Sequence, residues 1–181
     1  TNHTNRVELA CTSTQGLTTP KISISFPDEG YFRMQFEPFT APTWATGSTD
    51  YTVDESNPDY VWIHGPSISL KINKAPYQME VYDENGELIT KESDRSGYRS
   101  LAFKTNGTDY VNQVEENLFT SSDESFTGFG MRYDALNQRG KNVDIYAVNW
   151  YLEQENKTYL PIPFYFSNQG YGTYLNSTYY T

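Results

Sequence analysis

The sequence contains one cysteine and two histidines, and this scarcity excludes several kinds of site. Cys11 has no second cysteine with which to form an internal disulfide or a cysteine-based zinc site. A serine nucleophile needs a histidine partner, and nothing around His64 forms such a constellation. We interpret His64 as a strand residue beside Gly65-Pro66 and predict neither a metal site nor a cofactor.

Positive charge is also scarce, because 13 Lys and Arg residues stand against 23 Asp and Glu residues and the net charge is −10. Such a chain repels polyanions on average, and no run of basic residues offers a local exception. Nucleic acids and anionic membrane surfaces are therefore excluded as partners. No apolar stretch is long enough for a transmembrane helix.

The cellular location is barely indicated by the sequence. The start, Thr1-Asn2-His3-Thr4, has no basic segment followed by an apolar run, so we expect any signal peptide to have been removed already. Sequons for N-glycosylation begin at Asn2, Asn106, Asn156 and Asn176, about as many as chance gives for this composition. The polar, acidic composition is compatible with a secreted or cell-surface protein, and the location is otherwise left open.

Aromatic residues are abundant, and they make up 16% of the 181 residues, with 16 Tyr and 10 Phe. Apolar and polar residues alternate with a period of two, which is typical of half-buried strands. The alternating apolar sets are Ile22, Ile24 and Phe26; Phe32, Met34 and Phe36; Ile68, Leu70 and Ile72; Tyr77, Met79 and Val81; Leu101 and Phe103; Val143 and Ile145; and Ile162, Phe164 and Phe166. Leu88 and Ile89 are expected on a return strand after the turn at residues 83–86. The pattern predicts an all-β fold, an antiparallel β-sandwich of roughly ten short strands.

Turns and loops divide these strands. Pro27-Asp28-Glu29-Gly30 predicts a hairpin turn with one strand face in the core and the other in water. Two longer loops are expected over Thr40–Pro58 and Asp134–Lys141. No linker divides the chain, so we expect a single domain over residues 1–181.

Several local patterns resemble catalytic motifs without their spacing. Neighbouring carboxylates occur at Asp28-Glu29, Asp54-Glu55, Glu115-Glu116 and Asp123-Glu124. Adjacent strand residues point to opposite faces, so we interpret these pairs as solvated turns and strand edges rather than a glycosidase pair. Asp83-Glu84-Asn85-Gly86-Glu87 lacks the ligand spacing of a calcium loop and fits a hairpin turn. Gly128-Phe129-Gly130 is no phosphate loop, and its glycines indicate close backbone approach beneath aromatic packing.

Four blocks near the C-terminus resemble one family when they are taken in order. They are Ser125-Phe-Thr-Gly-Phe-Gly-Met-Arg-Tyr-Asp134, Asn137-Gln-Arg-Gly-Lys-Asn-Val-Asp-Ile-Tyr146, Tyr159-Leu-Pro-Ile-Pro-Phe-Tyr-Phe-Ser167 and Gly170-Tyr-Gly-Thr-Tyr-Leu-Asn176. Together they are similar to the N-terminal domain of glycoside hydrolase family 31. The resemblance is strong from Phe126 to Tyr180 and rests only on strand pattern and position before that.

This resemblance implies a galactose-mutarotase-like β-sandwich, or supersandwich, that precedes a (β/α)8 barrel. In the family the barrel carries both catalytic Asp residues of a retaining mechanism on α-glycosides. The chain ends at Thr181, about where the resemblance places the end of the sandwich, so we expect no catalytic residue and no turnover in this chain. Its expected partners are its own barrel and an α-linked oligosaccharide or glucan.

One loop of the family's sandwich reaches the substrate pocket of the barrel, and here it corresponds to Val148–Thr158. The resemblance implies substrate-binding roles for Asn149, Trp150 and Tyr151, since an amide can bond to sugar hydroxyls and aromatic rings can stack on a pyranose. Asn149 stands where many members carry Asp, and Met131 stands where Glu is frequent. Both departures put the exact specificity in doubt.

Two other classes of function stay open. The chain fits a free-standing carbohydrate-binding module with Trp44, Trp62 and Trp150 as a stacking platform. It also fits a structural or adhesive sandwich without a ligand. An aldose mutarotase is disfavoured, because its catalytic set of His and Glu is scarcely provided by two isolated histidines.

Overall fold

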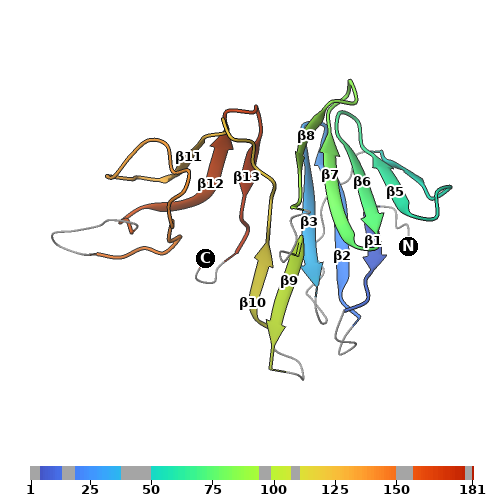
Figure 1. Cartoon of the computed structure of the whole chain (residues 1–181), viewed down its shortest axis with the longest axis horizontal. Coiled ribbons are helices and arrows are strands. Elements are labelled where there is room, and N and C mark those ends of the chain that lie inside the picture. The colour runs from blue at the N-terminus through green and yellow to red at the C-terminus, as the bar shows by residue number, and fades with distance from the viewer. Residues whose placement is uncertain are drawn as a thin grey trace. The chain divides into compact units, whose positions relative to one another are not determined.

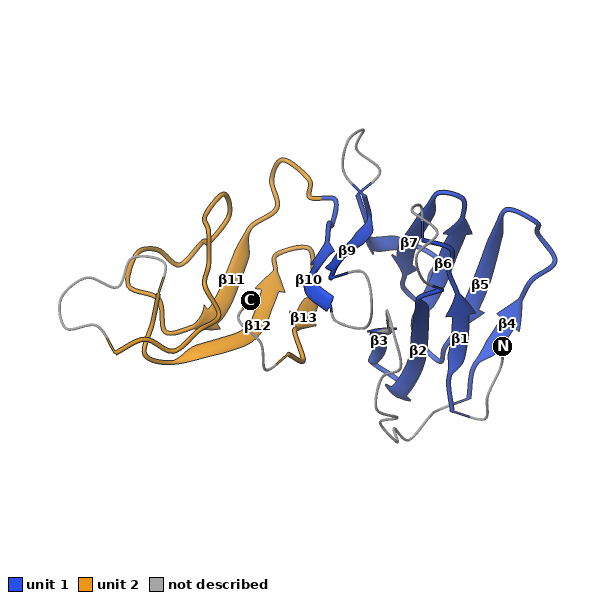
Figure 2. Cartoon of the chain, turned by 90° about the horizontal axis from the view of Figure 1, so that it is seen from below, with its two compact units in different colours: residues 1–119 blue, residues 120–181 orange. Residues whose placement is uncertain are grey.

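The computed structural model describes residues 5–13, 19–37, 50–93, 99–106, 111–149, 157–177 and 181. These residues form 13 strands and no helix, which confirms the all-β fold class. Consequently, no helix in this part of the chain is long and apolar enough to cross a membrane. The chain divides into two compact units, unit 1 (residues 1–119) and unit 2 (residues 120–181), coloured in Figure 2. The single domain predicted over residues 1–181 stays a prediction.

Unit 1 contains two larger antiparallel sheets and a two-stranded hairpin (Figure 1). The three-stranded sheet has the order β1-β2-β3, with bounds Val7–Ala10, Lys21–Asp28 and Tyr31–Glu37. The five-stranded sheet has the order β4-β5-β6-β7-β8, with bounds Thr52–Asp54, Tyr60–His64, Ser69–Lys74, Tyr77–Tyr82 and Leu88–Lys91. The hairpin pairs β9 with β10, at Leu101–Thr105 and Val111–Glu116.

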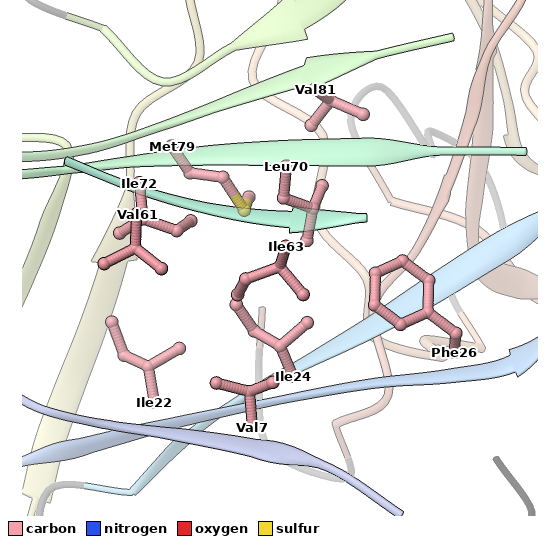
Figure 3. Close-up of a cluster of buried hydrophobic side chains, with 10 residues drawn as sticks. All are labelled: Val7, Ile22, Ile24, Phe26, Val61, Ile63, Leu70, Ile72, Met79 and Val81. Carbon is pink, nitrogen blue, oxygen red and sulfur yellow. The ribbon is translucent and has the colours of Figure 1, made fainter. Parts of the chain in front are cut away.

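The core of unit 1 lies between these two sheets, as a sandwich requires. Ten buried apolar side chains from β1, β2, β5, β6 and β7 meet there (Figure 3). They are Val7, Ile22, Ile24, Phe26, Val61, Ile63, Leu70, Ile72, Met79 and Val81. Each such side chain contributes roughly 1.5–3 kcal/mol when it leaves water, so this cluster dominates the stability of unit 1. The period-two pattern therefore identified the inward face of β2, β6 and β7 correctly, whereas the sequence analysis made no prediction for β1 or β5.

The predicted hairpin between β2 and β3 is confirmed, with Ile22 opposite Phe36 and Ile24 opposite Met34. The prediction that its second face is in water is wrong for β2, because Ser23 and Ser25 are also buried, at 6% exposure each. A central strand is paired on both edges, and here it is covered on both faces. Small hydroxyl side chains tolerate such a position when they find hydrogen-bond partners.

Two predictions about the positions of strands and loops are wrong. Within the expected loop Thr40–Pro58, Thr52–Asp54 forms β4, because Val53 packs on the core as β4 pairs with β5. Residues 40–49 lie outside the described part. The strand expected at Val143 and Ile145 is absent there, because the Asp144 carbonyl accepts a bond from the Arg132 guanidinium instead of a neighbouring strand.

The turn between β7 and β8 is confirmed at Asp83–Gly86. The Asp83 carboxylate accepts bonds from the N–H groups of Asn85 (2.9 Å) and Glu87 (2.8 Å), and Gly86 takes a φ of 78°. These bonds lower the pKa of Asp83, that from Glu87 most. The carboxylate thus closes a hairpin turn, as the sequence predicts.

Unit 2 has one described sheet, with the order β11-β12-β13 and bounds Phe126–Gly130, Pro161–Ser167 and Gly172–Tyr174. Both pairings are antiparallel. The expected loop Asp134–Lys141 contains no strand, in agreement with the sequence. The strand predicted from Ile162, Phe164 and Phe166 is β12.

A buried carboxyl group lies just beyond β8 in unit 1. Glu92 is 0% exposed, and its Oε2 accepts the N–H of Met79 at 2.6 Å. Burial raises the pKa of Glu92 from 4.5 to about 8, and the negative charge of Glu116 adds to the rise, against the effect of the Met79 bond. The neutral acid therefore predominates in the folded protein at neutral pH.

This burial predicts a pH dependence of stability. The folded protein keeps its proton up to about pH 8, whereas the unfolded chain loses it near 4.5, so the free energy of unfolding falls as pH rises between these values. The slope from this group is about 1.4 kcal/mol per pH unit. Urea denaturation from pH 5 to 8.5 should show a decline that is shallower in Glu92→Gln, where the raised pKa of Glu116 still contributes, and unchanged in the exposed turn variant Glu84→Gln. Equal slopes in wild type and Glu92→Gln would contradict the assignment.

Candidate functional site

The end of β11 is built around two glycines that lie against β12. Gly128 and Gly130 have φ values of 122° and 87°, and Phe129 between them has 62°. A Cβ at Gly130 would lie 2.0 Å from the carbonyl oxygen of Leu160, closer than any real contact. The ring of Phe129 stacks on Tyr165 at 5.0 Å. The sequence-based interpretation of close backbone approach beneath aromatic packing is confirmed.

Arg132, two residues after Gly130, binds the backbone at the end of β11 and in the segment that follows. Its Nε donates to the carbonyl of Phe129 at 3.1 Å, and its NH2 group donates to the carbonyl of Asp144 at 3.0 Å. Burial lowers the pKa of Arg132, while the nearby carboxylates of Asp134 and Asp144 act in the opposite direction. A guanidinium remains charged under these conditions, so it holds the segment before residue 148 against the end of β11.

Thr158 closes the base of the predicted substrate loop. It is 0% exposed and forms a parallel bridge with Ala147, while the N–H of Val148 donates to its carbonyl at 3.0 Å. Its hydroxyl donates to the carbonyl of Met131. The two limbs of the loop are therefore tied to each other and to the end of β11. We call Met131, Arg132, Ala147, Val148 and Thr158 the loop clamp.

The structure describes only some of the residues that the sequence analysis predicted as sites. Asn149 is exposed and comes directly after the clamp on the outgoing limb. Trp150 and Tyr151 lie outside the described residues, as does Trp44. Trp62 lies in β5, half-buried, with its ring stacked on His64 at 5.4 Å and beside Tyr82 at 5.2 Å. Of the substrate-binding set, the structure thus positions Asn149 alone.

The loop over Asp134–Lys141 is held by a polar network of its own. The Asp134 carboxylate bonds to Lys141 Nζ at 2.7 Å and to Gln138 Nε2 at 3.1 Å. These bonds, with Lys141 first, hold the pKa of Asp134 well below its ordinary value. Gln138 is buried, and Arg139 donates to the carbonyl of Glu124. Hydrogen bonds therefore shape this loop where a hydrophobic core would otherwise do so.

Glu124 corrects the interpretation of the acidic pairs. We expected solvated carboxylates, but Glu124 is 4% exposed. Its Oε1 accepts from Ser167 Oγ at 2.6 Å and from the Tyr171 hydroxyl at 2.7 Å, and its Oε2 accepts from the N–H of Ser121 at 3.2 Å. With every oxygen satisfied, this carboxylate joins β12 to the chain before β11. Asp28, Asp54 and Glu115 are exposed, as expected, whereas Glu116 is exposed as a residue but has a carboxyl group whose pKa is raised by burial.

Other candidate sites gain no support from the described residues. His64 is an exposed strand residue whose Nδ1 lies 3.0 Å from Ser69 Oγ. Within the described ranges no group of three or more His, Cys, Asp or Glu residues is arranged to hold a metal ion. Fold and site together define an all-β scaffold that presents a clamped loop.

This scaffold belongs to a known family. Residues 21–181 match the model of the glycosyl hydrolase 31 N-terminal galactose mutarotase-like domain, so the chain belongs to that family. The match begins well before Phe126, where the resemblance in the sequence becomes strong. The galactose-mutarotase-like fold class expected from the sequence is confirmed.

Relatives with this domain are much longer proteins. An isomaltosyltransferase of Sporosarcina globispora is 35% identical over 100% of this chain and 17% of its own length. The cycloalternan-forming enzyme from Listeria monocytogenes, solved with a pentasaccharide substrate, is 38% identical with a TM-score of 0.91, over 99% of this chain and 17% of that one. A family 31 dextranase of Flavobacterium johnsoniae, 23% identical with a TM-score of 0.75 over 97% and 21%, shares the fold. The chain thus spans about a sixth of the first two relatives.

The close approach at Gly130 predicts a specific cost for a methyl group there. Gly130→Ala and Gly140→Ala both place alanine at positive φ (87° and 73°), which costs about 1–2 kcal/mol. Nothing lies within 4 Å of a Cβ at Gly140, whereas Gly130→Ala also collides with the backbone of Leu160. Hydrogen exchange in β11 and β12 should therefore accelerate far more in Gly130→Ala. Equal acceleration in the two variants would refute the packing argument.

Proposed function

We propose that this chain is the non-catalytic N-terminal domain of a larger family 31 enzyme that acts on α-linked glucose oligosaccharides. The observation that carries the proposal is the loop clamp, which fixes the start of Val148–Thr158 against β11 and leaves Asn149 exposed. A residue that lines a substrate pocket needs a backbone that is held in place and a polar group that the substrate can reach. In this proposal the (β/α)8 barrel of the parent supplies both catalytic carboxylates.

The substrate class follows from sugar chemistry and from the relatives. The amide of Asn149 offers two donors and an acceptor to vicinal hydroxyls, and Trp150 and Tyr151 next to it supply faces for a pyranose ring. One relative is named as a transferase of isomaltosyl groups, and the cycloalternan-forming enzyme was solved with a pentasaccharide substrate. Their similarity supports glucosyl transfer or hydrolysis by the parent protein of this chain.

The alternative of a free-standing module gains less support. Its platform needs exposed aromatic faces, but the Trp62 ring is stacked on His64 and half-buried. A ring so engaged offers less area to a sugar than a freely exposed one.

The isolated chain should show no turnover. The isolated 181-residue chain should leave a chromogenic α-glucoside unhydrolysed at a concentration at which typical glycosidases give measurable rates. Hydrolysis needs the two catalytic carboxylates, which in this proposal belong to the barrel. Turnover that survives repurification would overturn this proposal. Retarded migration of the isolated chain in gels that contain α-glucan would favour the binding-module alternative.

Asn149 should matter in the parent enzyme and not for the fold. Asn149→Ala should lower kcat/KM for an α-linked oligosaccharide roughly tenfold, the loss of about one hydrogen bond to a sugar hydroxyl, with an unchanged Tm. Asn149→Asp keeps an acceptor and should lose less. The matched control is Asn142→Ala, since Asn142 is exposed in the same unit but lies before the loop. An unchanged kcat/KM in Asn149→Ala would refute the loop assignment.

A further inference from the structure

Unit 2 differs from unit 1 in what it buries. Every hydrophobic residue buried in the described part of the chain belongs to unit 1. The residues buried in the described part of unit 2 are all polar: Glu124, Gln138, Asp144, Thr158 and Ser167. A three-stranded sheet needs a covered apolar face to be stable, so unit 2 as described lacks the burial that its sheet requires.

Unit 2 does contain apolar side chains, and several of them are exposed, although Phe164 is half-buried. Ile162, Phe164 and Phe166 alternate along β12 and share one face, and the pairing of Phe164 with Tyr174 puts Tyr174 on the same face. Ile162 is 45% exposed, Phe166 56% and Tyr174 61%. The rings of Phe164 and Phe166 meet edge to face at 4.6 Å. We call these four residues the open face.

The outward face of the five-stranded sheet in unit 1 shows what a solvent face of this protein looks like. There Lys71 and Glu80 form an ion pair at 3.4 Å, and Asn73 bonds to Gln78 and Glu80 at 3.2 Å. The open face of β12 and β13 instead carries aliphatic and aromatic side chains and no charge. A contiguous apolar patch of this kind marks an interaction surface.

We infer that the open face, Ile162, Phe164, Phe166 and Tyr174, is the surface on which the remainder of the parent chain packs. This inference rests on the proposed function. The relatives carry about five sixths of their length outside this domain, which supplies a covalently linked partner at high effective concentration. Because the face has no charge, it does not attract a polyanion, and because only the Tyr174 hydroxyl could bond to a sugar, an apolar protein surface fits it better than a sugar does.

Unit 1, taken by itself, buries its own apolar side chains. Its ten-residue core is already closed between its own sheets, with Ile24, Phe26, Ile63 and Leu70 at 0% exposure. A second copy of the chain is the other candidate occupant, and the experiment separates the two.

The test compares the 181-residue chain with the full-length parent. Photochemical carbene footprinting should label Phe166 and Tyr174 in the short chain and leave them protected in the parent. Phe166→Lys and Tyr174→Lys should barely change the Tm of the short chain, because the side chains are exposed there. In the parent, each should lower the Tm and reduce kcat/KM roughly tenfold or more, because a lysine would be buried without a partner. Leu88→Lys, at a residue 50% exposed in unit 1, is the matched control and should have no effect in either protein.

Each other outcome overturns the inference in a distinct way. A large loss of Tm for Phe166→Lys in the short chain would show that the chain covers the face itself. A homodimer of the short chain that Phe166→Lys dissociates would assign the face to a second copy. Equal labelling and a neutral Phe166→Lys in an active parent would refute the inference and leave the proposed function intact. Protection of the face in a parent without activity on α-glucosides would refute only the proposed function.

Discussion

The close approach of β11 to β12 at Gly130 is the constraint on which unit 2 depends. A side chain at this position would collide with the carbonyl of Leu160, so the strand can turn there only with glycine. The turn brings Arg132 and the carbonyl of Met131 to where they bind Asp144 and Thr158. The loop clamp is therefore a consequence of two backbones in contact, and the position of Asn149 follows from the clamp.

Much of the fold was predictable because the core of unit 1 obeys a simple rule. Side chains such as Ile22, Ile24 and Leu70 alternate with polar neighbours, and a period of two has one geometric meaning in a sheet. β10 carries no such signal, since Val111 and Val114 are separated by an odd number of steps and Val114 is exposed. Its pairing with β9 is bulged between Val111 and Gln113, and a pattern of alternation cannot reveal a bulged strand.

Buried polar residues were not predictable, and the reason is physical. Glu92 and Glu124 look like surface carboxylates in the sequence, because a carboxylate is buried only where partners from distant segments meet it. Ser167 and Tyr171 reach Glu124 across more than forty positions of sequence. The four ordered motif blocks gave no sign of these contacts. They indicated the family and the predicted substrate loop, but not the roles of Arg132 or Thr158 at the base of that loop.

The two units thus bury different kinds of side chain. Unit 1 satisfies its apolar side chains internally and supplies most of the stability through its closed core. Unit 2 instead buries polar groups, which give its loops a defined geometry but little free energy. An apolar partner that covered the open face would add to the stability of unit 2, because it would bind the folded state and not the unfolded chain. The start of the loop at Asn149 is thus set by the hydrogen bonds of the loop clamp rather than by a buried hydrophobic core.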